Sequence, residues 1–90
     1  MILVTNIGTR PDSYRSDAMI DKWREYNSVP GGVHCCVHGC HAWATDGAHV
    51  TVAGRGRRQY IVPMCHKHNC QFGKTMFVRD EARPAPLTSL

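Results

Sequence analysis

Two short pairs of cysteine and histidine residues constrain this chain more than any other feature of its sequence. Cys36 and Cys40 are four positions apart, Cys65 and His68 are three apart, and twenty-four residues separate the two pairs. Thiolate sulfur and imidazole nitrogen are the ligands that zinc takes in tetrahedral structural sites. Each pair fits on one tight turn, so a single ion would join both turns and close the loop between them. The sequence therefore predicts a structural zinc site whose four protein ligands leave no open position for catalysis.

The choice of ligand within each pair has alternatives. Cys35 in place of Cys36 adds one residue to the first turn, and His66 or Cys70 stands close enough to replace His68. We favour His68 because side chains three residues apart at a helix start point to the same side. The competing interpretation of the whole group is a set of buried thiols without a metal ion.

The size of the chain also favours a metal. Ninety residues form one small domain, near the size at which an apolar core alone gives marginal stability. Bound zinc contributes ~10–16 kcal/mol of coupled folding energy in such domains. The five cysteines are an odd number, and histidines are interleaved with them, which argues against a disulfide framework. We expect no secretory signal, no membrane span and a cytoplasmic setting.

The N-terminal third is expected to form a strand and a helix. Residues 2–7 are apolar and β-branched, which predicts a short strand, and residues 9–13 have turn chemistry. A helix is expected from about Ser16, because apolar residues then recur at the spacing of one helical face. The apolar stripe consists of Met19, Ile20, Trp23 and Tyr26. We expect this stripe to pack on the zinc-stabilised part of the domain.

The remainder is expected to form a hairpin, the second ligand turn and a last strand. Residues 48–52 and 59–62 are predicted strands, and the glycine-containing segment 53–58 suits the loop between them. Residues 72–78 are expected to give a helical turn and a strand. Residues 81–90 are rich in proline and polar residues and are expected to be a flexible tail.

Charge is spread unevenly along the chain. Residues 1–35 have no net charge, whereas residues 36–79 carry six Lys and Arg residues against Asp46 alone. A basic metal-binding half favours a polyanionic partner such as DNA or RNA. The candidate contact residues are Arg55, Arg57 and Arg58 in the hairpin loop, with Lys67 and Lys74 widening the patch. The competing interpretation is a solvated loop whose arginines only keep the protein soluble.

The predicted layout resembles a known class of zinc domain. A cysteine turn, a β-hairpin and a second ligand pair at a helix start resemble the treble-clef zinc finger. Residues 48–50 and 60–69 resemble the zinc-containing branch of the HNH nuclease superfamily. The chain also resembles a group of small bacterial and phage proteins, through Gly8-Thr9, Trp23 and residues 36–40, 47–50 and 60–69. These resemblances imply a zinc-stabilised α+β domain of the treble-clef, ββα-metal-like type over residues 1–80, with its zinc core at 34–78.

The nuclease resemblance implies catalytic roles for two residues. His49 matches the general base that activates water, and Asn69 matches a position that holds a divalent ion, magnesium or manganese, at the phosphate. Ala48 and Tyr60, however, stand where the family has a metal ligand and an orienting asparagine, and the nearest acid is Asp46. The competing interpretation of His49 is a structural histidine in the hairpin.

Two classes of function are therefore expected. The first is a non-catalytic zinc module that binds nucleic acid or a nucleic-acid-associated protein. A variant of it is a phage protein that modulates a host factor in the host cytoplasm. The second is a metal-dependent DNA endonuclease or nickase that uses His49 and Asn69. We favour the first class because Ala48 and Tyr60 replace two catalytic positions of the nuclease family.

Overall fold

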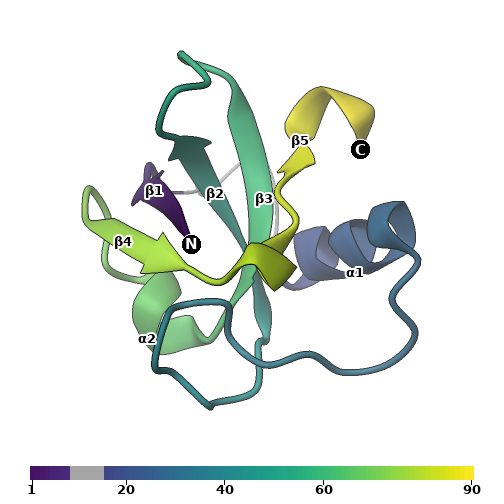
Figure 1. The fold of residues 1–90 in the computed structure, drawn as a ribbon. Coiled ribbons are helices and arrows are strands. Elements are labelled where there is room, and N and C mark those ends of the chain that lie inside the picture. Colours follow the sequence, from purple (N-terminus) through teal and green to yellow (C-terminus); the bar gives the residue numbers. More distant parts are fainter. Residues whose placement is uncertain (9–15) are drawn as a thin grey trace.

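A five-stranded antiparallel sheet organises the fold in the computed structural model, which describes residues 1–8 and 16–90 (Figure 1). The helices and strands are β1 (Ile2–Asn6), α1 (Ser16–Asn27), β2 (Asp46–Val52), β3 (Gln59–Met64), α2 (His66–Asn69), β4 (Thr75–Val78) and β5 (Ala85–Pro86). Short 3-10 turns cover Asp80–Ala82 and Leu87–Ser89. The strand order is β4-β1-β2-β3-β5. The α+β class and the predicted first strand, helix and hairpin are confirmed, while the predicted turn at 9–13 and Thr9 lie outside the described residues.

Alternation along the strands gives the sheet two faces with different coverings. The cysteine face packs against Cys35, Cys36 and Cys65, and its strand residues are Val4, Ala48, Val50, Val52, Tyr60, Val62, Met64, Met76 and Val78. The opposite face, which we call the helix face, is covered by α1, where Met19 and Trp23 pack with Ile61 of β3. The helix thus packs on β2 and β3, which belong to the predicted zinc core, as expected from the sequence, and it covers the face of the sheet opposite the cysteine turns.

Gly47 sets how closely α1 approaches the sheet. A Cβ atom at Gly47 would lie 2.6 Å from the backbone of both Met19 and Ile20. Backbone atoms inside a packed helix cannot move aside cheaply, so a side chain at this position is excluded. The glycine of β2 thus permits the contact that buries the helix stripe.

The stripe of α1 is confirmed except at its last position. Met19, Ile20 and Trp23 are buried, whereas Tyr26 is 49% exposed. Tyr26 lies at the rim of the helix face, beside Leu90, where it lines an open depression and is not enclosed by the sheet. Within the described ranges, neither helix has the length and apolar character of a membrane span.

The C-terminal segment is part of the domain, and its prediction as a flexible tail was wrong. Ala85 and Pro86 form β5, which pairs with Ile61 and Tyr60 of β3. Proline is tolerated there because β5 is an edge strand, whose outer side needs no ladder hydrogen bond. The indole Nε1 of Trp23 also donates to Ala82 O at 2.8 Å, which holds the segment against α1.

Candidate metal centre

Four side chains from two distant turns converge on the cysteine face. The ligand atoms of Cys35, Cys40, Cys65 and His68 all lie within 4.8 Å of one another, and we call this group the Cys/His cluster. His68 Nδ1 lies 3.2 Å from Cys65 Sγ and 3.6 Å from Cys35 Sγ. Bond lengths in tetrahedral zinc sites place neighbouring sulfur and nitrogen ligands about 3.5 Å apart. The donor types and the two sulfur–nitrogen distances are therefore suitable for binding one metal ion.

The first two ligands lie on a tight turn over residues 35–40. The backbone N–H of Cys40 donates to Val37 O at 3.0 Å and closes the turn. Gly39 has a φ of 83°, a left-handed conformation in which a residue with a Cβ atom is strained. The turn brings the thiols of Cys35 and Cys40 together, so the first pair contains the alternative Cys35 in place of the favoured Cys36.

Arg79 attaches this turn to the end of β4. Its guanidinium donates to Cys40 O at 3.2 Å and also to Cys35 O, and its backbone N–H donates to Cys36 O at 2.8 Å. The backbone carbonyls of the ligand turn are thereby held by one side chain and one strand end. The sequence shows Arg79 only as part of the basic charge, because nothing local indicates which carbonyls it meets.

The second pair lies where α2 begins. Cys65 has extended backbone angles and accepts a 3.0 Å hydrogen bond from the Asn69 N–H, so His68 projects from the first turn of the helix. The buried side chain of Asn6 on β1 donates to Asn69 O at 2.9 Å and to His68 O at 3.3 Å. Our reasoning from sequence missed Asn6, although an asparagine at an inward position of an apolar strand was a usable indication.

Cys36 lies outside the Cys/His cluster, and its predicted place is taken by Cys35. The backbone of Cys36 bridges two strands, since its N–H donates to Pro63 O at 2.9 Å and its carbonyl accepts from Arg79. Side chains alternate along extended backbone, so Cys36 points away from its neighbour Cys35. The spacing from Cys40 does not reveal this alternation. His66 and Cys70, the alternatives to His68, also lie outside the cluster.

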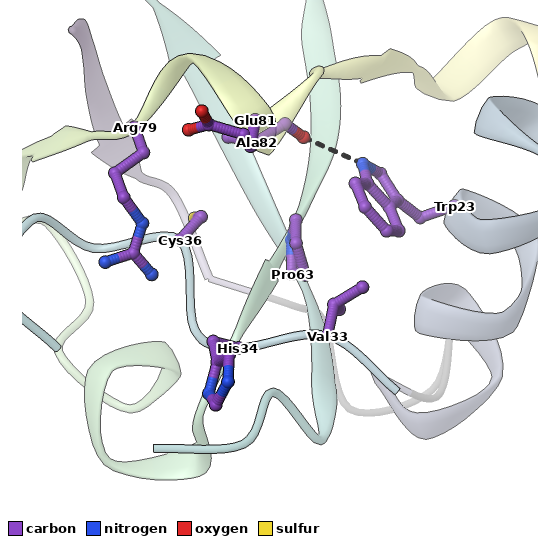
Figure 2. A pocket seen from close by; sticks show the side chains of 8 residues that line it. All are labelled: Trp23, Val33, His34, Cys36, Pro63, Arg79, Glu81 and Ala82. Atoms are coloured by element: carbon purple, nitrogen blue, oxygen red, sulfur yellow. Dashed lines mark hydrogen bonds between the residues drawn. The ribbon is translucent and has the colours of Figure 1, made fainter. Parts of the chain in front are cut away.

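The thiol of Cys36 faces a separate pocket (Figure 2). The pocket has a volume of about 390 Å³. Its walls are formed by apolar Trp23, Val33, Pro63 and Ala82, and by His34, Arg79 and Glu81. Burial raises the pKa of Cys36 far above its usual value, so the thiol stays protonated.

The surroundings of the cluster favour the thiolate form of Cys40 but disfavour that of Cys35. Burial raises the pKa of Cys35 to about 12. A hydrogen bond from the backbone of Ala42 lowers the pKa of Cys40. Burial, with help from the charges of Lys67 and Lys74, lowers the pKa of His68 and keeps its imidazole neutral. A neutral imidazole is ready to bind a metal ion, and a divalent cation would supply the charge that a Cys35 thiolate requires.

A second polar group surrounds Asp46, next to the cluster. Its carboxylate accepts hydrogen bonds from Asn69 Nδ2 at 2.9 Å, from His66 Nδ1 at 2.8 Å and from Thr45 Oγ1 at 2.9 Å. Burial opposes ionisation of Asp46, but these three hydrogen bonds outweigh it and lower its pKa. Asp46 is therefore a buried carboxylate whose hydrogen bonds fix the two side chains from α2.

The two residues of the nuclease resemblance do not form one site. His49 pairs with Ile61 across β2 and β3, and alternation places its side chain on the helix face. Asn69 is hydrogen-bonded to Asp46 on the cysteine face. Burial also lowers the pKa of His49, which is enclosed beneath α1. The sheet thus separates the candidate base from the candidate ligand of a catalytic ion.

The predicted basic patch is divided between two parts of the molecule. Arg55, Arg57 and Arg58 are exposed in the loop over residues 53–58, which we call the hairpin tip. Lys67, in α2 just after β3, and Lys74, in the segment before β4, lie instead near His68.

The surroundings of the three arginines also differ. The guanidinium of Arg55 lies 5.3 Å from the ring centroid of Tyr60, over the face of the ring. Arg57 and Arg58 line a pocket of about 380 Å³ together with Gln59, Pro86, Leu87 and Thr88. The hairpin tip therefore places two cationic side chains at one concave surface.

Comparison of the chain with models of known protein families, with curated proteins and with solved structures finds no match.

Proposed function

We propose that the Cys/His cluster binds one structural zinc ion and that the chain is a small zinc-stabilised domain of the treble-clef type. The observation that carries this proposal is the convergence of three thiols and one imidazole within 4.8 Å. This donor set suits zinc, and four protein ligands leave no coordination position for a substrate. The arrangement of a cysteine turn, the β2–β3 hairpin and a ligand pair at the start of α2 supports the treble-clef assignment.

The adjacent residues Cys35 and Cys36 provide a matched test of this centre. Both are buried cysteines, but only Cys35 belongs to the cluster. We expect Cys35→Ser to lose the zinc ion and Cys36→Ser to retain one ion per chain, as measured by elemental analysis after dialysis against a weak chelator. Retention of zinc by Cys35→Ser together with its loss from Cys36→Ser would refute the assignment of ligands. Retention by both variants would refute the site.

We further propose that this domain binds nucleic acid through the hairpin tip. Arg57 and Arg58 are exposed beside one pocket, and across residues 1–8 and 16–90 no ion pair neutralises either of them. Gly54 and Gly56 have φ values of 85° and 65°, so the tip combines cations with a backbone that a phosphate can approach closely. A nuclease that uses His49 and Asn69 is not proposed, because the sheet lies between them.

The salt dependence of binding tests the hairpin tip. Each phosphate contact contributes about 0.7–0.9 to the slope of log K against log salt concentration. We expect the double substitution Arg57→Ala/Arg58→Ala to reduce that slope by about 1.5, measured by fluorescence anisotropy with a duplex DNA and an RNA of mixed sequence. The double substitution Lys67→Ala/Lys74→Ala removes the same charge near His68, away from the pocket that Arg57 and Arg58 line, and should leave the slope nearly unchanged. Equal reductions in both variants would contradict a contact at the hairpin tip.

A further inference from the structure

His66 and Cys70 form a second pair of metal-binding side chains, distinct from the Cys/His cluster. Both are exposed, and the side chain of His66 is 77% accessible. The backbone N–H of Cys70 donates to His66 O at 3.0 Å, so one helical turn brings the two side chains to the same side. His66 Nε2 lies 3.3 Å from Cys70 Sγ. Nitrogen and sulfur ligands of one zinc ion are about 3.5 Å apart, so both atoms are already placed to reach the same ion.

Asp46 orients His66 for this role. A carboxylate only accepts hydrogen bonds, so the 2.8 Å contact with Asp46 Oδ2 places the ring proton of His66 on Nδ1. The lone pair of Nε2 then points toward Cys70. The carboxylate is itself held by Thr45 and Asn69, at 2.9 Å each. A histidine that binds a metal through one nitrogen commonly donates its other N–H to a carboxylate in this way.

Cys70, His66 and Asp46 are also arranged like a thiol nucleophile, a histidine base and an orienting acid. A catalytic site of that kind needs a concave surface that holds the substrate. Neither His66 nor Cys70 lines any of the pockets described above. An exchangeable metal ion requires only its ligands and an open path from solvent, which this surface provides.

We propose that His66 Nε2 and Cys70 Sγ bind a second zinc ion at the surface of α2. An imidazole nitrogen and a thiolate are ligands that zinc accepts readily. Two protein ligands leave two tetrahedral positions to water or to groups of another molecule. This ion is therefore open and exchangeable, unlike the enclosed ion of the Cys/His cluster, and Asp46 acts on it only by positioning His66.

Calorimetric titration of Zn²⁺ into protein that already holds one equivalent tests this site. We expect a second binding event in the wild type. His66→Ala and Cys70→Ser should each weaken that event by about tenfold or more, and Asp46→Asn should weaken it about 10–100-fold by releasing the histidine. His41→Ala removes another exposed histidine and should leave the event unchanged.

Absence of a second event in the wild type, or its persistence in both His66→Ala and Cys70→Ser, would overturn the proposal. Replacement of these two exposed side chains is not expected to unfold the domain, and circular dichroism spectra of both variants check this. The Cys35→Ser variant tests only the first equivalent of zinc, which is bound by the Cys/His cluster. The two zinc proposals therefore stand or fall on different substitutions.

Discussion

Cys65→Ala is expected to abolish both metal binding and cooperative unfolding. Cys65 supplies a thiol 3.2 Å from His68 Nδ1, whereas its backbone carbonyl, which accepts the hydrogen bond that starts α2, is unchanged by the substitution. Zinc contributes ~10–16 kcal/mol to the folding of small zinc domains, which equals or exceeds the whole stability of a typical domain, about 5–15 kcal/mol. Loss of the ion should therefore leave a largely unfolded chain, measured by elemental analysis and thermal denaturation followed by circular dichroism.

Cys70→Ala is the matched control for Cys65→Ala, because Cys70 is exposed and lies outside the Cys/His cluster. With zinc limited to one equivalent, it should retain the structural ion and the wild-type unfolding midpoint. A strong chelator added to the wild type should reproduce the behaviour of Cys65→Ala. A metal-free Cys65→Ala protein that unfolds with the wild-type midpoint would contradict a structural role for the ion.

Trp23→Ala is expected to lower the free energy of unfolding by about 3–5 kcal/mol. Trp23 is 2% exposed and packs with Met19 and Ile61 between α1 and the sheet. Its indole Nε1 donates to Ala82 O at 2.8 Å and Arg83 O at 3.0 Å, so the substitution creates a cavity and removes the contact that holds the C-terminal segment. Denaturant titration at saturating zinc measures the change without the contribution of metal loss.

The second tryptophan provides the control for this substitution. Trp43 is 63% exposed and stacks on the ring of His34, with centroids 4.4 Å apart. Trp43→Ala should lower the free energy of unfolding by less than about 1 kcal/mol, because the side chain buries little apolar surface in the folded state. Equal decreases in the free energy of unfolding for Trp23→Ala and Trp43→Ala would show that Trp23 does not anchor α1 to the helix face.

The elements that the sequence predicted are those set by local patterns. Periodicity identified α1 and the strands β2 and β3, and turn residues identified the hairpin between them. The pairing of β5 with Tyr60 and Ile61 was not predictable in this way, because residues 85–86 are held by distant contacts rather than by their own composition. Ala85, which packs with Trp23 and Ile61, and the proline that follows it give no periodic pattern.

The same distinction applies to the candidate metal centre. The spacing of the ligand pairs correctly indicated Cys40, Cys65 and His68 as members of one cluster. The choice between Cys35 and Cys36 depended on Pro63 and Arg79, which meet the backbone of this turn only in the folded chain. The sequence alone could have predicted that His49 and Asp46 lie on opposite faces of the sheet. They are three positions apart on one strand, and side chains an odd number of positions apart point to opposite faces.

The attachment of the first ligand turn to β4 links metal binding to the risk of aggregation. β4 lies at the edge of the sheet, and Phe77 O and the Arg79 N–H bond to His38 N and Cys36 O of that turn. Loss of the ion would loosen the attachment of the turn to α2 and thereby weaken the hydrogen bonds that cover the outer backbone groups of β4. An unpaired strand edge is a template for pairing with another chain. Zinc depletion is thus expected to promote intermolecular β-pairing as well as unfolding.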